Sequence, residues 1–321
     1  MHKGIEKRFE SMTWTDAPRL AGRVSGDTTV AHSIGYCQAL EAASGCEVPG
    51  RAAWIRALLL ERERIANHVG DIGAISNDAA FTFLLYQTAI LRERLIRTNL
   101  KLFGHRLTMD KVMPGGVNVD ITADGANQIL QELTAFSSEF EKLVQIYEET
   151  PSLEDRTCNA GILSPSLAKD MGVVGVVARA SNQLIDARVH YSCPPYNVIA
   201  PNVIRRADGD VNSRIWVRID EVRDSIRLIR EIIGGLPQGP LSAPCPAPQP
   251  GATGISFVEG WRGEIVWWVQ AGPDSAINRV MVRDPSSVNW LALEQAIKGN
   301  IVPDFPLCNK SFNQSYSGND V

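Results

Sequence analysis

Several features are missing from this sequence of 321 residues, and each absence excludes a class of protein. No run of about 18 or more uninterrupted apolar residues occurs, so the sequence predicts no membrane-spanning helix. Its 32 lysines and arginines do not outnumber its 36 aspartates and glutamates. Since no long basic run occurs either, we expect no nucleic-acid partner. The charged first ten residues lack the apolar centre of a secretory signal.

Cysteine pairs of the CxxC type are also missing. The six cysteines stand alone, at positions 37, 46, 158, 193, 245 and 308. Zinc and iron–sulfur sites held by four cysteines use closely spaced pairs, so we expect no such site in this chain. Isolated cysteines of this kind indicate free, mostly packed thiols in a reducing compartment.

Helical periodicity dominates what is present. Apolar residues recur at three- and four-residue steps from Trp54 to Ile72, which predicts an amphipathic helix. We expect a second, buried helix over 81–102 that ends near Gly104. A third helix should run over about 126–149, where Pro151 stops it. A fourth should begin at a cap formed by Asp210 or Asn212 and end at residues 234–235.

The other segments predict turns and strands. Residues 113–120 form a turn, and 155–196 combine loops, a short strand and a helix. Six prolines in 236–254 indicate an extended loop, after which a period of two predicts an antiparallel meander over 255–259, 263–271 and 277–282. Of two adjacent tryptophans, 267 and 268, one should be in the core. A short helix over 286–298 and an irregular polar tail follow. We therefore divide the chain into a helical core (1–235), a proline-rich linker loop (236–254) and a C-terminal β element with helix and tail (255–321).

Four separated motifs carry the chemical information. They are HKGIEK (2–7), RVSGDTTVAHS (23–33), EGWRGE (259–264) and DFPLCNKSFN (304–313). Together they resemble the large subunit of nickel–iron hydrogenases, in which two cysteine pairs at corresponding positions bind nickel and iron through soft thiolates. Ser25 and Thr28 stand at the first two cysteine positions, and Cys308 and Ser311 at the last two. Since only one thiol remains, the resemblance implies no nickel–iron site and no other metal site.

The middle of the chain resembles the D-type subunit of complex I, the respiratory NADH–quinone reductase. The segments that carry this resemblance are ERERIANHV (61–69), Asp78, Arg92–Glu93, MPGGV (113–117), MGVVGVVARASNQLIDAR (171–188) and GDVNSR (209–214). The best agreement is with membrane-bound hydrogenases of the formate hydrogenlyase type. The strands that precede HKGIEK in this family have no counterpart in the sequence. The resemblance implies an α+β fold with a mainly helical core bundle and a small C-terminal antiparallel β element.

The resemblance also implies roles for nine residues. Glu6, Asp78 and Arg262 match catalytic positions, whereas cofactor-binding positions are matched by Arg23, Ser25, Thr28, His32, Cys308 and Ser311. Plainer roles stand beside these. Residues 25–29 could simply form a turn and a helix N-cap, and Cys308 could be a packed thiol. Glu6 could be a glutamate in the first turn of a helix, and His32 and His68 could be core residues. Arg262 could instead pair with Glu259 or Glu264. Asp78 could be an exposed helix cap.

The function implied is that of a subunit of a complex I-like or hydrogenlyase-like oxidoreductase, active only within its complex. It would line an acceptor cavity for a quinone, next to a 4Fe–4S cluster in an iron–sulfur partner that resembles the B-type subunit of complex I. A protein resembling the C-type subunit and membrane-arm subunits would hold it at the cytoplasmic side of the inner membrane. The alternative is a non-catalytic coupling or scaffold subunit with a vestigial site, in which side chains fill the region between Ser25, Cys308 and Arg262.

Overall fold

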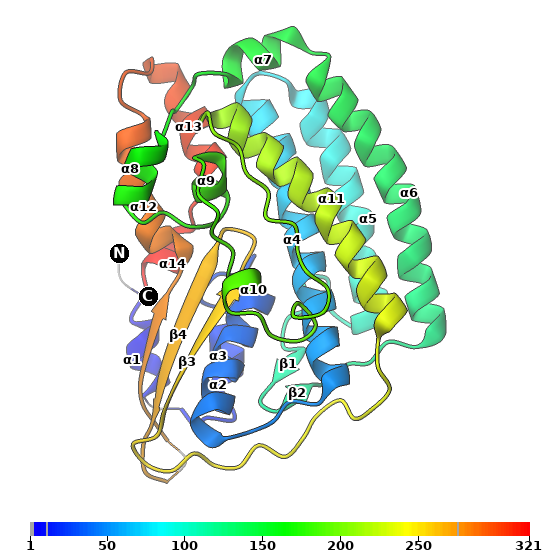
Figure 1. Cartoon of the computed structure of the whole chain (residues 1–321), viewed down its shortest axis with the longest axis vertical. Helices are drawn as coiled ribbons and strands as arrows, with labels where there is room; N and C mark the ends of the chain where they lie inside the picture. Colours follow the sequence, from blue (N-terminus) through cyan, green and yellow to red (C-terminus); the bar gives the residue numbers. More distant parts are fainter. Residues whose placement is uncertain (1–2, 11, 275) are drawn as a thin grey trace.

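The computed structural model describes residues 3–10, 12–274 and 276–321. His2 of the first motif lies outside these residues. Much of the described chain belongs to long helices, which are α3 (Thr29–Ser44), α4 (Gly50–Asp78), α5 (Thr82–Phe103), α6 (Ala123–Glu148) and α11 (Val211–Gly235). Figure 1 shows α4 in the middle of the molecule, with α5 and α11 packed along it and α6 on their outer side. We find no helix among the described residues with the length and hydrophobicity that a bilayer span needs.

Shorter elements surround this bundle. The helices are α1 (Ile5–Phe9), α2 (Ala17–Ala21), α7 (Pro151–Thr157), α8 (Pro165–Asp170), α9 (Gly175–Ala180), α10 (Ala187–His190), α12 (Pro285–Ala296), the 3₁₀ helix η1 (Val302–Asp304), α13 (Phe305–Phe312) and α14 (Tyr316–Asn319). A small hairpin joins β1 (Val112–Met113) to β2 (Gly116–Val117). The two ends of the chain lie side by side, because the Lys3 amide donates to Asp320 O at 3.1 Å.

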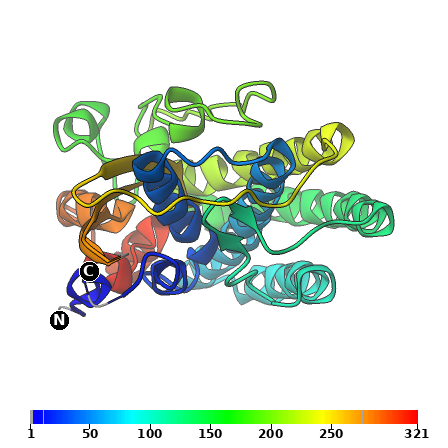
Figure 2. The same cartoon turned by 90° about the horizontal axis from the view of Figure 1, so that it is seen from below.

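The antiparallel sheet consists of β3 (Thr253–Glu259), β4 (Glu264–Ala271) and β5 (Ile277–Arg283), in that order. Helix α3 packs against it, and Figure 2 shows the chain from below with α3 beside the sheet. The Ser256 hydroxyl donates to Gly35 O at 2.7 Å. Trp267 is fully buried and Trp268 is not, as the alternation predicts. Gly35 allows this packing, because a Cβ there would lie 2.5 Å from Cδ1 of Trp267.

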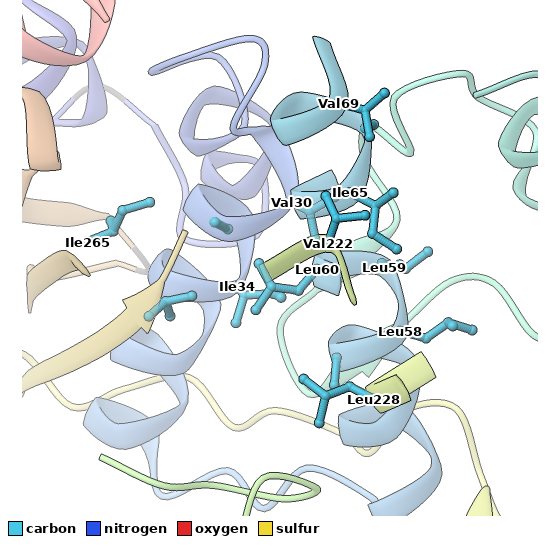
Figure 3. Close-up of a cluster of buried hydrophobic side chains, with 14 of the residues drawn as sticks. Val30, Ile34, Leu58, Leu59, Leu60, Ile65, Val69, Val222, Leu228 and Ile265 are labelled. Atoms are coloured by element: carbon cyan, nitrogen blue, oxygen red, sulfur yellow. The ribbon is translucent and has the colours of Figure 1, made fainter. Parts of the chain in front are cut away.

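One hydrophobic cluster joins the bundle to the sheet. In Figure 3 it includes Val30 and Ile34 of α3, Leu58 and Val69 of α4, and Ile265 of β4. The cluster therefore contains residues from both sides of the proline-rich loop. The expected α+β fold with a helical core and a small antiparallel sheet is confirmed.

Helices α4, α5, α6 and α11 and the meander lie close to their predicted positions, whereas no range had been predicted for α3. Three local predictions were wrong. Residues 155–196 contain short helices and turns and no strand. The tail is not irregular, since it forms η1, α13 and α14, and Phe312 is buried. Helix α5 is not buried on all sides, because Phe83, Tyr86 and Ile90 are exposed. An apolar run does not reveal which neighbour covers it, and the short helices of the tail and of residues 155–196 gain their stability from packing.

The contact between α4 and α5 gives a testable prediction. A Cβ at Gly73 would lie 1.9 Å from Oγ1 of Thr88 and 3.1 Å from the backbone oxygen of Leu84. Gly73→Ala should therefore lower the free energy of unfolding by about 1–3 kcal/mol, measured by chemical denaturation. Gly70→Ala in the same helix is the control, because its Cβ would meet only the flexible Arg92 side chain, at 3.2 Å. Equal stability of the two variants would contradict the packing described.

Candidate functional site

The loop between α2 and α3 is built around one carboxylate. Asp27 accepts hydrogen bonds from the hydroxyls of Ser25, at 2.7 Å, and Thr28, at 3.0 Å. Ser25 and Thr28 are buried, whereas the Asp27 side chain is 40% exposed. The two hydroxyls at the family's thiolate positions therefore serve to fix the Asp27 carboxylate.

Arg262 reaches this carboxylate from the β3–β4 turn. Its Nη1 and Nη2 donate to Asp27 Oδ1 and Oδ2 at 2.8 and 2.7 Å. Its guanidinium carbon lies 3.9 Å from the centre of the Trp261 ring, which fixes its plane. The sequence had suggested Glu259 or Glu264 as an alternative partner of Arg262. That suggestion was wrong, because Glu259 binds Arg179 and Glu264 binds Arg283.

The ion pair changes the chemistry of Asp27. Burial alone would raise the pKa of its carboxyl group, but the hydrogen bonds and the charge of Arg262 outweigh burial. Together with the two hydroxyls they hold the pKa of Asp27 well below its usual range. Asp27 therefore stays ionised at neutral pH and is a poor proton donor.

The C-terminal tail completes the site. The Nε of Arg262 donates to Asn313 O at 2.6 Å, and Nδ2 of Asn313 donates to Asp71 Oδ1 at 2.6 Å. The hydroxyls of Ser25 and Ser315 lie 3.0 Å apart. The N-terminal loop and the tail therefore meet, through Asn313 and Ser315 rather than through Cys308.

Cys308 and Ser311 lie one turn apart on α13. Ser311 is engaged in hydrogen bonds, and Cys308 is packed against its neighbours. The Ser311 hydroxyl donates to Cys308 O at 2.6 Å and accepts from Arg214 Nε at 2.9 Å. Cys308 is buried against Gly161, where a Cβ would lie 2.7 Å from its sulfur. Burial raises the pKa of the Cys308 thiol, so it stays protonated.

This donor set does not fit nickel and iron. Soft metals need thiolates, whereas the four positions offer three hydroxyls in hydrogen bonds and one protonated thiol. No group of three or more histidine, cysteine or acidic side chains in the described part of the chain could hold a metal ion.

The remaining predicted residues contact other parts of the chain. The exposed Arg23 pairs with Asp110. His32 is buried with its Nε2 3.0 Å from Asp284 Oδ2. Glu6 on α1 accepts from the Val282 amide at 2.9 Å. Asp78, the half-buried last residue of α4, has its pKa raised by burial. Among residues 3–10, 12–274 and 276–321, Arg262 has no hydrogen bond or ion pair to Glu6 or Asp78.

Sequence reasoning missed Asp27, Asp71 and Glu63. The available signal for Asp27 was its place between Ser25 and Thr28 in the second motif. An acid there needs a cation, and the third motif supplies one in Arg262.

Glu63 of α4 caps helix α3, a role that the sequence had suggested for residues 25–29. The Thr28 side chain makes no capping bond. Instead, the Glu63 carboxyl group accepts from the amides of Val30, at 2.7 Å, and Ala31, at 3.2 Å. Burial and the charge of Asp27 raise the pKa of Glu63 to about 8, although the two amides oppose this shift. A small cavity of about 10 Å³, roughly the space for one water molecule, is lined by Glu63, Asp27, Asn67 and Arg92.

A larger cavity of 280 Å³ lies elsewhere, between α3, α4, α10 and β3. Its mainly apolar wall includes Ile34, Leu60 and Phe257, and its polar wall includes Arg56 and Tyr196. Ser25, Arg262 and the tail are not among its lining residues.

The fold and this arrangement of motifs define the class of the hydrogenase large subunit and the related subunit of complex I. The family model for the 49 kDa subunit of respiratory-chain NADH dehydrogenase matches residues 71–253. The chain belongs to this family.

Relatives in both branches cover the chain. It is 32% identical over 321 residues to formate hydrogenlyase subunit 5 of Escherichia coli, spanning all of this chain and 56% of that relative. It is 30% identical over 310 residues to the D 2 subunit of NADH-quinone oxidoreductase from Solibacter usitatus, covering 95% of this chain and 83% of that one. Thus the chain spans little more than half the length of the E. coli relative.

A solved structure shows the same fold. A chain of the membrane-bound sulfane sulfur reductase, an archaeal respiratory membrane complex, superposes with a TM-score of 0.94 at 25% identity, covering 100% of this chain and 89% of that one. The chain is therefore related over its whole length to subunits of membrane-bound respiratory complexes of the complex I and hydrogenase type.

The Glu63 carboxyl group predicts a pH dependence. Its pKa is about 8 in the folded protein against an ordinary value of 4.5, so the unfolded chain loses this proton first. The contribution of Glu63 to stability should therefore fall as the pH rises from about 4.5 to about 8, by up to about 1.4 kcal/mol per pH unit. In chemical denaturation, Glu63→Gln should remove this slope. Glu139→Gln, at an exposed position on α6, should keep it, and an unchanged slope in Glu63→Gln would contradict the assignment.

Proposed function

We propose that this chain is a subunit of a membrane-associated respiratory oxidoreductase and that it forms one wall of an electron-acceptor site. The wall consists of loop 25–28, Arg262 and tail residues 313–315. The observation that carries the proposal is the Asp27–Arg262 ion pair, which joins three distant segments and leaves Asp27 partly exposed.

A quinone is the acceptor that we propose. Its carbonyl oxygens gain negative charge on reduction, and a guanidinium can donate hydrogen bonds to such oxygens. Since Asp27 stays ionised, the protons would come from other acids. We propose Glu6 and Asp78 for this role on the basis of the family resemblance.

The remaining parts of the proposal concern the complex. An iron–sulfur partner that resembles the B-type subunit of complex I would hold a 4Fe–4S cluster next to the site. A protein resembling the C-type subunit and membrane-arm subunits would keep the chain at the cytoplasmic side of the inner membrane. Relatives named as formate hydrogenlyase and NADH-quinone oxidoreductase subunits support this assembly.

One observation favours a second function, that of a non-catalytic coupling subunit. Ser25 binds Asp27 and Ser315, and Arg262 binds Asp27, Thr28 and Asn313. Side chains therefore occupy part of the region where an acceptor would lie. In this alternative, the ion pair has only a structural role.

The replaced thiolates predict that the complex contains no stoichiometric nickel. The measurement is elemental analysis of the complex purified from the organism in which the protein is made and matured. Iron should be present from partner clusters, which makes it an internal control for loss of metal during purification. Nickel at one atom per complex would contradict the assignment.

Arg262→Lys tests the acceptor site. Lysine keeps the charge but loses the planar fork that holds Asp27 and the tail. The purified complex would be reduced with dithionite, and reoxidation of its iron–sulfur clusters by a water-soluble quinone would be followed by absorbance. The quinone concentration at half-maximal rate should rise roughly tenfold, the equivalent of about 1.4 kcal/mol.

Arg223→Lys is the matched control, since Arg223 makes a two-pronged pair with Glu141 on the exposed face of α11. This variant should behave like the unmodified complex. If Arg262→Lys assembles and reoxidises at the parental rate at every quinone concentration, the coupling-subunit alternative is correct.

A further inference from the structure

Two half-buried cysteines meet where the C-terminal end of α3 passes the proline-rich loop. Cys46 follows Gly45, whose left-handed conformation (φ 68°) ends α3. Cys245 belongs to the loop that connects α11 to β3. Neither residue belongs to the site proposed above.

Backbone hydrogen bonds hold the cysteine-bearing loop in place. The Val117 amide donates to Leu241 O at 2.9 Å, and the Ala243 amide donates to Gly115 O at 3.0 Å. Gly115 permits this approach, because a Cβ there would lie 2.3 Å from Ala243 O. The loop is therefore fixed against the β1–β2 hairpin just before Cys245.

The two sulfur atoms share one environment. The Ser44 hydroxyl lies 3.3 Å from the Cys245 sulfur, and the Cys46 sulfur lies 3.9 Å from the backbone oxygen of Pro244, the residue before Cys245. Residues 44–46 and 244–245 thus run past each other with their side chains in contact.

The two thiols are not equivalent. Burial and the neighbouring Cys245 sulfur raise the pKa of Cys46 to about 12, so Cys46 stays protonated near neutral pH. The Cys245 sulfur lies within reach of the Ser44 hydroxyl, which can donate to a thiolate, whereas the Cys46 thiol faces the Pro244 carbonyl oxygen. We therefore assign Cys245 as the attacking sulfur and Cys46 as the resolving one.

We propose that Cys46 and Cys245 form a redox-active dithiol that small-molecule disulfides oxidise to an intramolecular disulfide. The Cys245 thiolate attacks one sulfur of oxidised glutathione and releases one glutathione thiol. Cys46 loses its proton, attacks the Cys245 sulfur of the mixed disulfide and releases the second glutathione. Two protein thiols are oxidised and one glutathione disulfide is reduced to two thiols, so electrons and protons balance.

The disulfide would fasten the loop to the end of α3. Loop residues 242–245 line a surface groove of 630 Å³ together with Trp14, Arg19 and Met113. Oxidation would add a covalent link to the hydrogen bonds that hold this loop and would slow amide hydrogen exchange over 238–248.

Other cysteines serve as internal controls. Cys37 is fully buried, and burial raises its pKa. Cys158 lies at the end of α7, half-buried as the pair is. Neither should form a disulfide with Cys245.

The experiment treats the purified complex with oxidised glutathione, blocks remaining thiols with N-ethylmaleimide and maps disulfides by peptide mass spectrometry. A Cys46–Cys245 link that dithiothreitol reverses is expected in the unmodified complex and in the control Cys158→Ser. In Cys46→Ser, Cys245 should retain one glutathione, whereas in Cys245→Ser, Cys46 should be alkylated or free.

Phenylarsine oxide, which bridges adjacent thiols without oxidising them, supplies a second measurement. It should protect both cysteines from alkylation in the unmodified complex and neither in the single variants. The proposal is overturned if the assembled complex forms no Cys46–Cys245 link, if Cys245 pairs with Cys37 instead, or if the arsenical protects neither thiol.

Discussion

The structure depends on a cluster of charges buried around helix α4. This helix is covered on most sides, yet Glu61, Arg64 and His68 lie fully inside the protein. Arg64 donates to Glu61 at 3.1 Å, and His68 Nε2 lies 2.8 Å from Glu221 of α11. Removing one partner from such a cluster leaves an uncompensated buried charge and costs about 3–5 kcal/mol. The cluster therefore specifies one alignment of α4 and α11, which hydrophobic packing alone would constrain less strictly.

The same charges position the candidate site. Arg179 of α9 bridges Glu221 and Glu259, at 2.7 Å to each, and the Ala187 amide donates to the second Glu259 oxygen at 2.9 Å. Glu259 ends β3, so these bonds fix the turn that carries Arg262 three residues later. Gly175 lets α9 approach that turn, because a Cβ there would lie 1.9 Å from Arg262 O. The buried ion pairs of Glu259 therefore hold the turn in the position from which Arg262 reaches Asp27.

Much of this architecture follows from local patterns in the sequence. The periodicity around Trp54, the cap at Asp210 and the alternation through Trp267 found elements that are long or strongly patterned. Short helices such as α13 and α14 were missed, because they gain their stability from packing rather than from their own sequence. The motifs identified the loop, Arg262 and the tail as neighbours. They did not reveal that Asp27 joins them, because the pairing of an acid in one motif with a cation in another is visible in neither motif alone.

The departure from the hydrogenase pattern can be understood through this ion pair. In the hydrogenase pattern that the motifs resemble, metal–thiolate bonds would tie the N-terminal loop to the C-terminal tail. Here the Ser25–Ser315 contact and the bonds from Arg262 to Asp27 and to Asn313 make that connection. Hydroxyls suit this arrangement better than thiols, since they are stronger hydrogen-bond donors to a carboxylate. These bonds therefore hold the loop to the tail, and they leave the ionised Asp27 carboxylate partly exposed beside a guanidinium that is itself nearly buried.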